Sequence, residues 1–170
     1  MPRQYTVRVT ERGGGSTASW ASSAGVRRSM QANRGRDTKP ELRLRKELHA
    51  LGLRYRVAAR PLPQIRRTAD VVFTRARIAV FIDGCFWHGC PTHHTVAKTN
   101  AEFWAAKIEG NMRRDRETDA LLEDKDWLVI RIWEHEALDT AVATIHRAWL
   151  ERTGRTEPEG DRDDRGCGTA

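Results

Sequence analysis

Apolar residues follow a helical period between Thr38 and Gly52. Thr38 precedes a Lys-Pro step and is followed three residues later by Glu41, a spacing typical of a capping box at a helix start. Gly52 is placed to end the helix in a left-handed conformation. The helix should present one apolar face, formed by Leu44, Leu48 and Leu51.

The apolar positions that follow have the patterns of strands. Leu53, Tyr55 and Val57 alternate with arginines, as in a half-buried strand. Two short apolar runs, residues 69–73 and 78–82, predict a pair of strands, because only a few polar residues separate them. Residues 127–133 are rich in β-branched and aromatic side chains, and we expect this strand to be central in the sheet.

Two further helices complete the pattern. One should begin after Asn100 or Thr99 as the cap and run to about Glu123. The other should cover about residues 137–150, with an apolar face formed by Leu138, Val142, Ile145 and Trp149. We therefore predict an α/β fold in which helices flank a small mixed β-sheet.

The 170 residues suffice for one domain with a core of its own. We place this domain at residues 25–150. Residues 1–24, rich in Gly, Ser, Thr and Ala, and the acidic residues 151–170 are expected to be flexible tails. Residues 25–37 form a basic arm that either contacts phosphates or is merely solvated; its candidate DNA contacts are Arg27, Arg28 and Arg34.

Composition narrows the function class. The formal net charge of +7 favours a polyanionic partner, although many basic proteins bind no nucleic acid. No apolar run reaches the roughly 18 residues of a spanning helix, and the N-terminus has no apolar signal core. The odd number of cysteines does not suggest a disulfide framework. We expect a cytoplasmic protein with no membrane association.

Cys85, Cys90 and His93 place three good zinc ligands within nine residues. Thiolates and imidazole at this spacing suit a closed tetrahedral Zn²⁺ site. The fourth ligand is either His135, which directly follows the strand at 127–133, or the adjacent His94. The alternative interpretation is two buried cysteines beside surface histidines without a metal.

Asp70 lies inside an apolar strand run, where a carboxylate is costly unless it is paired or binds a cation. Asp83 ends the next predicted strand, so the two carboxylates suit a Mg²⁺ ion. For Asp83 the alternative is a turn before Gly84. His88 is either a proton acceptor for water attacking a phosphorus or a spare histidine in the metal loop.

Phe86 and Trp87 are adjacent large aromatics in a loop flanked by glycines. Such side chains either act as wedges at a base step or pack over the metal site. Glu41 has its capping explanation and would not be assigned to catalysis on its own.

Several motifs, taken in order, resemble the very-short-patch mismatch repair (Vsr) endonucleases, over about residues 25–150. The resemblance depends on six segments and their order along the chain. These are Arg36-Asp-Thr-Lys-Pro-Glu41, Thr68-Ala-Asp-Val-Val-Phe73, Val80-Phe-Ile-Asp-Gly-Cys-Phe-Trp-His-Gly-Cys-Pro91, Lys98-Thr-Asn-Ala-Glu-Phe-Trp104, Asn111-Met-Arg-Arg-Asp115 and Ile132-Trp-Glu-His135.

The resemblance implies a restriction-endonuclease-like core and a DNA repair enzyme. The enzyme would nick the strand carrying the thymine of a T·G mismatch, 5′ to that thymine. Such mismatches arise by deamination of 5-methylcytosine. The substrate would be duplex DNA, with which the protein would associate in the nucleoid, and we expect a monomer.

The resemblance also implies roles for the residues that match the family's motifs. Asp70 would be the main ligand of a catalytic Mg²⁺, His88 the general base, and Asp115 a support for the histidine; Glu41 would be an active-site residue. The structural zinc would be held by Cys85, Cys90, His93 and His135. The aromatics expected to wedge beside the mismatch are Phe86, Trp87 and Trp104.

The chain departs from the family pattern at the end of the second core strand. Where some members have Thr-His, it has Ile82-Asp83, so a threonine contact to the metal is absent and Asp83 is the candidate replacement. The Pro-Asp step of such nucleases is Ala69-Asp70, and no lysine follows Asp83 at the usual nuclease spacing. Two alternatives remain: a restriction-type nuclease acting on matched DNA, and a zinc-stabilised DNA-binding module without catalysis.

Overall fold

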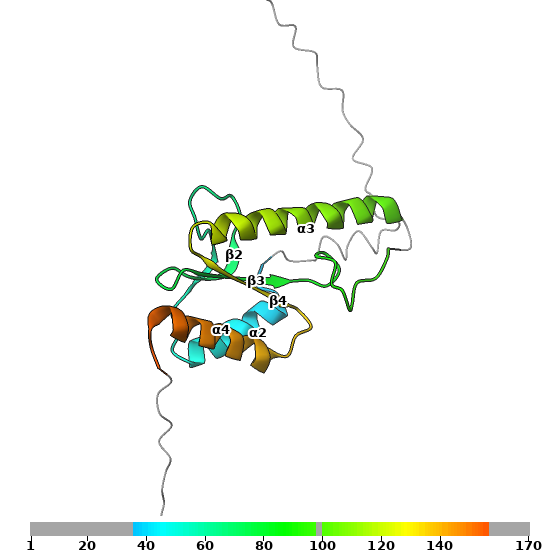
Figure 1. Cartoon of the computed structure of the whole chain (residues 1–170). Helices are drawn as coiled ribbons and strands as arrows, with labels where there is room; N and C mark the ends of the chain where they lie inside the picture. The colour runs from blue at the N-terminus through cyan, green and yellow to red at the C-terminus, as the bar shows by residue number, and fades with distance from the viewer. Residues whose placement is uncertain (1–35, 98–99, 157–170) are drawn as a thin grey trace, which may run out of the picture. The chain divides into compact units, whose positions relative to one another are not determined.

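The computed structural model describes residues 36–97 and 100–156. The expected N-terminal tail and the arm arginines at 27, 28 and 34 lie outside the described residues, as does the chain from 157 onward. The described part contains three helices and four strands (Figure 1). In chain order these are α2 (Lys39–Ala50), β1 (Arg56–Ala59), β2 (Ala69–Phe73), β3 (Ile78–Asp83), α3 (Ala101–Glu123), β4 (Leu128–Trp133) and α4 (Leu138–Thr153).

The four strands form one sheet in the order β1-β2-β3-β4. The pairs β1–β2 and β2–β3 are antiparallel, whereas β3 and β4 are parallel, so the sheet is mixed as predicted. The expectation that the strand at 127–133 is central was wrong, because β4 lies at one edge of this sheet. Its apolar composition has another cause: helices cover both faces of the sheet.

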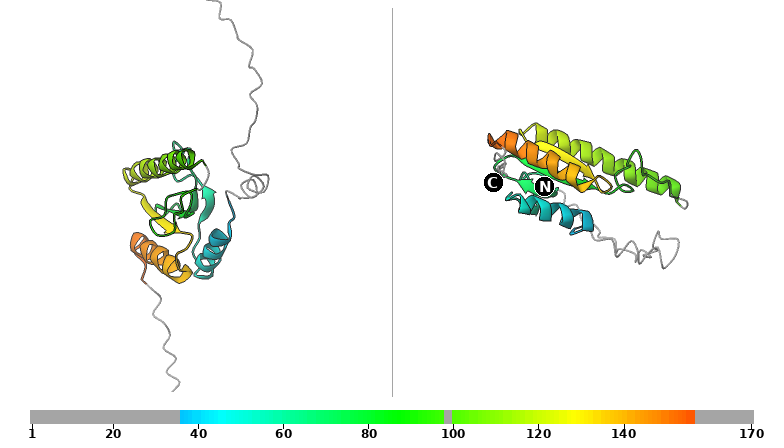
Figure 2. Two further views of the ribbon diagram at one scale, coloured as in Figure 1. Left: turned by 90° about the vertical axis from the view of Figure 1, so that its right-hand side faces the viewer. Right: turned by 90° about the horizontal axis from the view of Figure 1, so that it is seen from below.

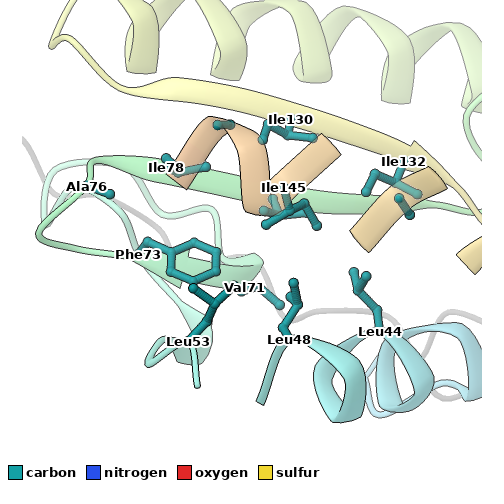
Figure 3. Close-up of a cluster of buried hydrophobic side chains, with 13 residues drawn as sticks. Leu44, Leu48, Leu53, Val71, Phe73, Ala76, Ile78, Ile130, Ile132 and Ile145 are labelled. Carbon is teal, nitrogen blue, oxygen red and sulfur yellow. The ribbon is translucent and has the colours of Figure 1, made fainter. Parts of the chain in front are cut away.

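Helices α2 and α4 pack on one face of the sheet and α3 on the other (Figures 1 and 2). The larger core lies between the sheet and the α2–α4 layer, where Leu48 and Ile145 are fully buried against strand residues such as Phe73 (Figure 3). A second cluster on the α3 side includes Leu122 and Trp127. The observed layers therefore confirm the predicted fold class.

The helix limits follow the predicted signals closely. Helix α2 ends before Gly52, which has a φ of 75°. Helix α3 begins after Asn100, whose backbone is also left-handed, with a φ of 54°. Helix α4 ends at Thr153, beyond the expected end at Leu150, where Gly154 adopts a φ of 65°. Within 36–97 and 100–156, no helix has the length and apolar character needed to cross a membrane.

The strand directions gather the chemically important residues at one end of the sheet. Because β2 and β3 are antiparallel, Asp70 at the start of β2 lies beside the end of β3. Because β3 and β4 are parallel, with Asp83 opposite Trp133, the segments that follow these two strands emerge side by side. This end of the sheet therefore holds the candidate site.

Candidate active site and metal centre

The loop that follows β3 is held by its own backbone and by β4. The carbonyl of Gly84 accepts hydrogen bonds from the backbone N–H groups of Trp87 and His88. The N–H of Cys85 donates to Oε1 of Glu134 at 2.7 Å, which ties the loop to the end of β4. Gly89 has a φ of 65°, and a Cβ there would lie 2.9 Å from Sδ of Met112, so a larger residue would strain this turn.

Four side chains converge at the base of this loop. One ligand atom from each of Cys85, Cys90, His93 and His135 lies within 4.8 Å of all the others. Sγ of Cys85 is 3.0 Å from Nδ1 of His135, and Sγ of Cys90 is 3.8 Å from the same nitrogen. Ligands about 2.0–2.3 Å from a tetrahedral ion lie roughly 3.3–3.8 Å from one another, so the spacing fits a single metal.

The two thiols differ in acidity. Burial raises the pKa of Cys90, but hydrogen bonds from Thr92 and His93 outweigh burial and bring that pKa down to about 6. For Cys85, burial and the neighbouring Cys90 raise the pKa to about 11. Ionisation of Cys85 beside Cys90 is thus unfavourable without a cation. A bound metal ion would supply that positive charge.

The competing ligand, His94, lies elsewhere. Its ring stacks on Phe86, with centroids 6.2 Å apart. The structure thus brings His135, and not His94, to Cys85 and Cys90. The route is the parallel pairing of β3 with β4, which brings the segments after these two strands side by side.

Asp70 sits at the sheet end with little compensation for its charge. Its Oδ2 accepts the backbone N–H of Ile82 at 2.7 Å. Burial, together with the nearby carboxylates of Glu41 and Asp83, raises the pKa of Asp70 to about 6 despite that hydrogen bond. A partly buried carboxylate with two acidic neighbours suits a divalent cation, which relieves the repulsion that raises the pKa.

Glu41 serves the start of helix α2 and faces the same region. It is buried, with 6% of its surface exposed. Its carboxylate accepts the backbone N–H of Asp37 at 3.0 Å and the hydroxyl of Thr38 at 2.8 Å, and it pairs with Arg45 at 3.1 Å. The capping role is therefore observed, and the charge of Glu41 also acts on Asp70.

His88 is braced by a carboxylate on α3. Its Nδ1 lies 2.7 Å from Oδ2 of Asp115. An ionised carboxylate can only accept a hydrogen bond, so this contact requires a proton on Nδ1. The lone pair of the neutral imidazole is then on Nε2, the nitrogen able to take a proton. The side chain keeps 27% of its surface exposed, so solvent and substrate have access.

Asp83 has a different environment from the one expected of a metal ligand. It is buried, and both of its carboxylate oxygens accept hydrogen bonds from Nη1 of Arg131, at 3.0 and 2.9 Å. Its nearer oxygen is 3.6 Å from Nδ1 of His88. Burial raises the pKa of Asp83, while Arg131 and His88 oppose that shift. The carboxylate thus faces a guanidinium and not an open position.

The three predicted DNA-wedging aromatics form one half-buried cluster beside His88. The ring centroids of Phe86 and Trp87 are 5.2 Å apart, and Trp104 from α3 lies 5.6 Å from Phe86 and 5.7 Å from Trp87. All three pairs meet edge to face, an arrangement that packing rings favour. Packing and partial exposure therefore coexist, and the role in DNA binding stays a prediction.

The sequence analysis missed three polar residues at this site: Glu134, Arg131 and Asp119. Glu134 ties down the metal loop. Arg131 joins Asp83 to Asp119 on α3 through hydrogen bonds from different guanidinium nitrogens. The sequence did contain a signal for Arg131, because it is the one charged residue in the apolar run at 127–133.

Comparisons with known proteins place the chain among DNA-cleaving enzymes. A family model described as DNA mismatch endonuclease Vsr matches residues 22–98. The type II nicking enzyme V.NaeI of Lentzea aerocolonigenes is 46% identical over 125 residues, covering 72% of this chain and 75% of that enzyme. The type II nicking enzyme V.NmeDIP of Neisseria meningitidis serogroup C is 43% identical over 114 residues, covering 66% and 75%. The DNA mismatch endonuclease Vsr of Escherichia coli (strain K12) is 38% identical over 111 residues, covering 63% and 67%.

The fold, the site and these relatives define a DNA endonuclease, a hydrolase of phosphodiester bonds. The chain belongs to the Vsr family of DNA mismatch endonucleases. The resemblance noted in the sequence is thereby confirmed, and with it the restriction-endonuclease-like core. A DNA-binding module without catalysis is not what these relatives indicate.

Proposed function

We propose that this endonuclease nicks the strand carrying the thymine of a T·G mismatch, 5′ to that thymine, and so starts very short patch repair. One observation carries the catalytic part: Asp115 holds Nδ1 of His88 at 2.7 Å, at the same end of the sheet as the neighbouring carboxylates of Asp70 and Glu41. The substrate part is supported by the mismatch endonuclease of E. coli among the relatives.

In this proposal, Asp70 is the main ligand of a catalytic Mg²⁺, and Glu41 adds negative charge to the same end of the sheet. The ion, when bound, would stabilise negative charge on the phosphate. Nε2 of His88 takes a proton from the water that attacks the phosphorus, while Asp115 keeps the ring oriented and stabilises the imidazolium. The P–O bond breaks, leaving one hydroxyl end and one phosphate end.

The second metal is structural. Cys85, Cys90, His93 and His135 would hold zinc and keep the loop after β3 in place. Fixing this loop matters because it carries both His88 and two of the aromatic side chains. Phe86, Trp87 and Trp104 would open the duplex at the T·G pair, which costs less to unstack than a matched pair. The protein acts as a monomer on duplex DNA.

A panel of labelled duplexes tests this function. Each strand is labelled in turn, and the central pair is T·G, C·G or T·A, with varied flanking bases and with Mg²⁺ present or omitted. We expect one nick, in the thymine strand of the T·G duplex, only with Mg²⁺. The variants Asp70→Ala and His88→Ala should bind the duplex and leave it uncut, whereas Glu109→Gln on the exposed surface of α3 should nick at the wild-type rate.

The second candidate function is cleavage of matched DNA. The relatives called type II nicking enzymes are the reason for considering it, and this chain would then be a restriction-type nuclease. Equal cutting of C·G and T·G duplexes would favour that function over mismatch repair. If no duplex were nicked, with any flanking sequence and with Mg²⁺ or Mn²⁺, both candidate functions would be refuted.

A further inference from the structure

Arg131 is surrounded by three carboxylates on the α3 side of the sheet. Nη1 donates to both oxygens of Asp83, at 3.0 and 2.9 Å. Nε and Nη2 donate to the carboxylate of Asp119, at 2.9 and 2.8 Å. Nη2 also lies 3.5 Å from Oδ1 of Asp115. The guanidinium is thus shared between the end of β3 and two successive turns of α3.

Packing fixes where this guanidinium lies. Arg131 is directly opposite Phe81 in the parallel β3–β4 pair, and its guanidinium carbon sits 4.7 Å from the centre of the Phe81 ring. The side chain is 22% exposed, and the side chain of Asp83 only 7%. A planar fork stacked on an aromatic ring and held by two carboxylates has little freedom to move.

The carboxylate of Asp115 connects this network to His88. Its Oδ1 faces Arg131, and its Oδ2 contacts Nδ1 of His88 at 2.7 Å. Asp83 approaches the same imidazole nitrogen at 3.6 Å. Both acidic neighbours of His88 are therefore held by one guanidinium. Without it, three carboxylates would repel one another beside the histidine.

We propose that Arg131 is a positioning residue for the nicking reaction, which orients His88 by holding Asp83, Asp115 and Asp119 in one arrangement. Asp83 belongs to this network and is not a ligand of the catalytic ion. The proposal rests on the proposed function, in which His88 accepts a proton. It replaces the metal role that the sequence suggested for Asp83.

Arg131→Lys is the main test, because it keeps the charge but loses the fork that two carboxylates share. We expect kcat to fall roughly 10- to 100-fold, by analogy with the loss of a side chain that orients a metal-bound imidazole. KM, and the affinity for duplex without divalent cation, should stay within about twofold of the wild type. Arg152→Lys is the matched control, since Arg152 forms an ion pair with the exposed Asp126 at 3.1 Å, and it should leave kcat unchanged.

A proton NMR experiment reads the position of His88 without any cleavage. The Nδ1–H proton held by Asp115 should give a downfield resonance, assigned by its absence in His88→Gln. We expect Arg131→Lys to shift or broaden this resonance, and Arg152→Lys to leave it in place. If the wild type cut no duplex, the proposed function would fail, yet this measurement would still decide whether Arg131 positions His88.

Two carboxamide variants separate Asp83 from the metal ligands. Thermal unfolding with and without Mg²⁺ should show the same Mg²⁺ stabilisation for Asp83→Asn as for the wild type, and none for Asp70→Asn. Loss of the Mg²⁺ effect in both variants would make Asp83 a ligand and overturn the proposal. A wild-type kcat or an unmoved His88 resonance in Arg131→Lys would overturn it as well.

Asp119→Asn covers the case in which Arg131→Lys does not fold. Asp119 is partly exposed, with 26% of its side chain accessible, and Arg131 would keep Asp83 as a partner. We expect a smaller fall in kcat, about threefold or more, and a shifted His88 resonance, because Arg131 loses the charge of one hydrogen-bonded carboxylate and keeps the other. An unchanged kcat and resonance in this variant would count against the positioning role.

Discussion

The substitution Asp70→Asn should make the protein more stable and catalytically inactive at the same time. Burial and two acidic neighbours raise the pKa of Asp70 from 3.8 to about 6. The folded protein therefore binds this proton more tightly than the unfolded chain does. Stability conferred by the protonated carboxyl is complete below about pH 3.8 and is lost as the pH rises through about 6.

The magnitude follows from the size of the shift. A difference of about two pH units corresponds to about 3 kcal/mol of destabilisation at pH 8, since one unit is worth about 1.4 kcal/mol. Asparagine carries no charge, and its Oδ1 can still accept the N–H of Ile82. We expect Asp70→Asn to raise the free energy of unfolding at pH 8 by up to about 3 kcal/mol, or the melting temperature by roughly 10 °C.

The assay is thermal and urea unfolding of both proteins from pH 4 to pH 8. Divalent cations are omitted and not chelated, because a chelator would also remove a metal from the Cys85 and His135 site. The difference between the two proteins should be largest at pH 8 and close to zero near pH 4. Glu109→Gln, an amide substitution on the exposed surface of α3, serves as the control and should change stability by less than about 0.5 kcal/mol.

Two results would refute this reasoning. One is an Asp70→Asn variant that is no more stable than the wild type at pH 8. The other is a stability difference that stays constant from pH 4 to pH 8, because the electrostatic cause would then be wrong. In the presence of Mg²⁺ the wild type should gain stability and the variant should not, which links the penalty at Asp70 to metal binding.

Three further predictions concern other parts of the molecule. Metal analysis of the purified wild type should find about one zinc per chain, and Cys90→Ser should lose both the zinc and the cooperative unfolding transition; a metal-free wild type with a normal transition would contradict this. Trp104→Ala should weaken binding to the T·G duplex by about 1–3 kcal/mol more than binding to matched DNA, as measured by fluorescence titration, and an equal loss for both duplexes would argue against a wedge. Leu48→Ala should lower the free energy of unfolding in urea by about 2–5 kcal/mol while kcat below the transition is unchanged; a loss under 1 kcal/mol would contradict the close packing at Leu48.

The local parts of the fold could be predicted from the sequence because their signals are local. The Thr38 and Glu41 spacing placed the start of α2, and Gly52 its end. The position of β4 could not be predicted in the same way. An apolar strand indicates that both of its faces are covered, whereas its place in the sheet depends on pairing with residues 50 positions away in the sequence.

The same distinction between local and long-range signals applies to the candidate site. The predicted zinc ligands Cys85, Cys90 and His93 are close in sequence, so their spacing was informative, and His135 needed only the correct pairing of β3 with β4 to join them. Arg131, the partner of Asp83, stood out only as a charged residue in an apolar strand, and nothing in the local sequence linked it to Asp83. Arg131 is far from Asp83 in sequence, so the sequence left this carboxylate as either a metal ligand or the start of a turn before Gly84.

The partners of the acidic residues support the proposed position of the catalytic cation at Asp70. In the part of the chain that the structure describes, Glu41 pairs with Arg45, Asp83 with Arg131, and Asp115 with His88. Asp70 forms no ion pair among these residues, and its hydrogen-bond donor is a backbone N–H. Because a partly buried carboxylate is unfavourable without a counter-charge, Asp70 is the position at which an added cation gains most. Burial of this unpaired carboxylate, with Glu41 and Asp83 nearby, raises the pKa of Asp70, so the stability test and the metal test probe a single cause.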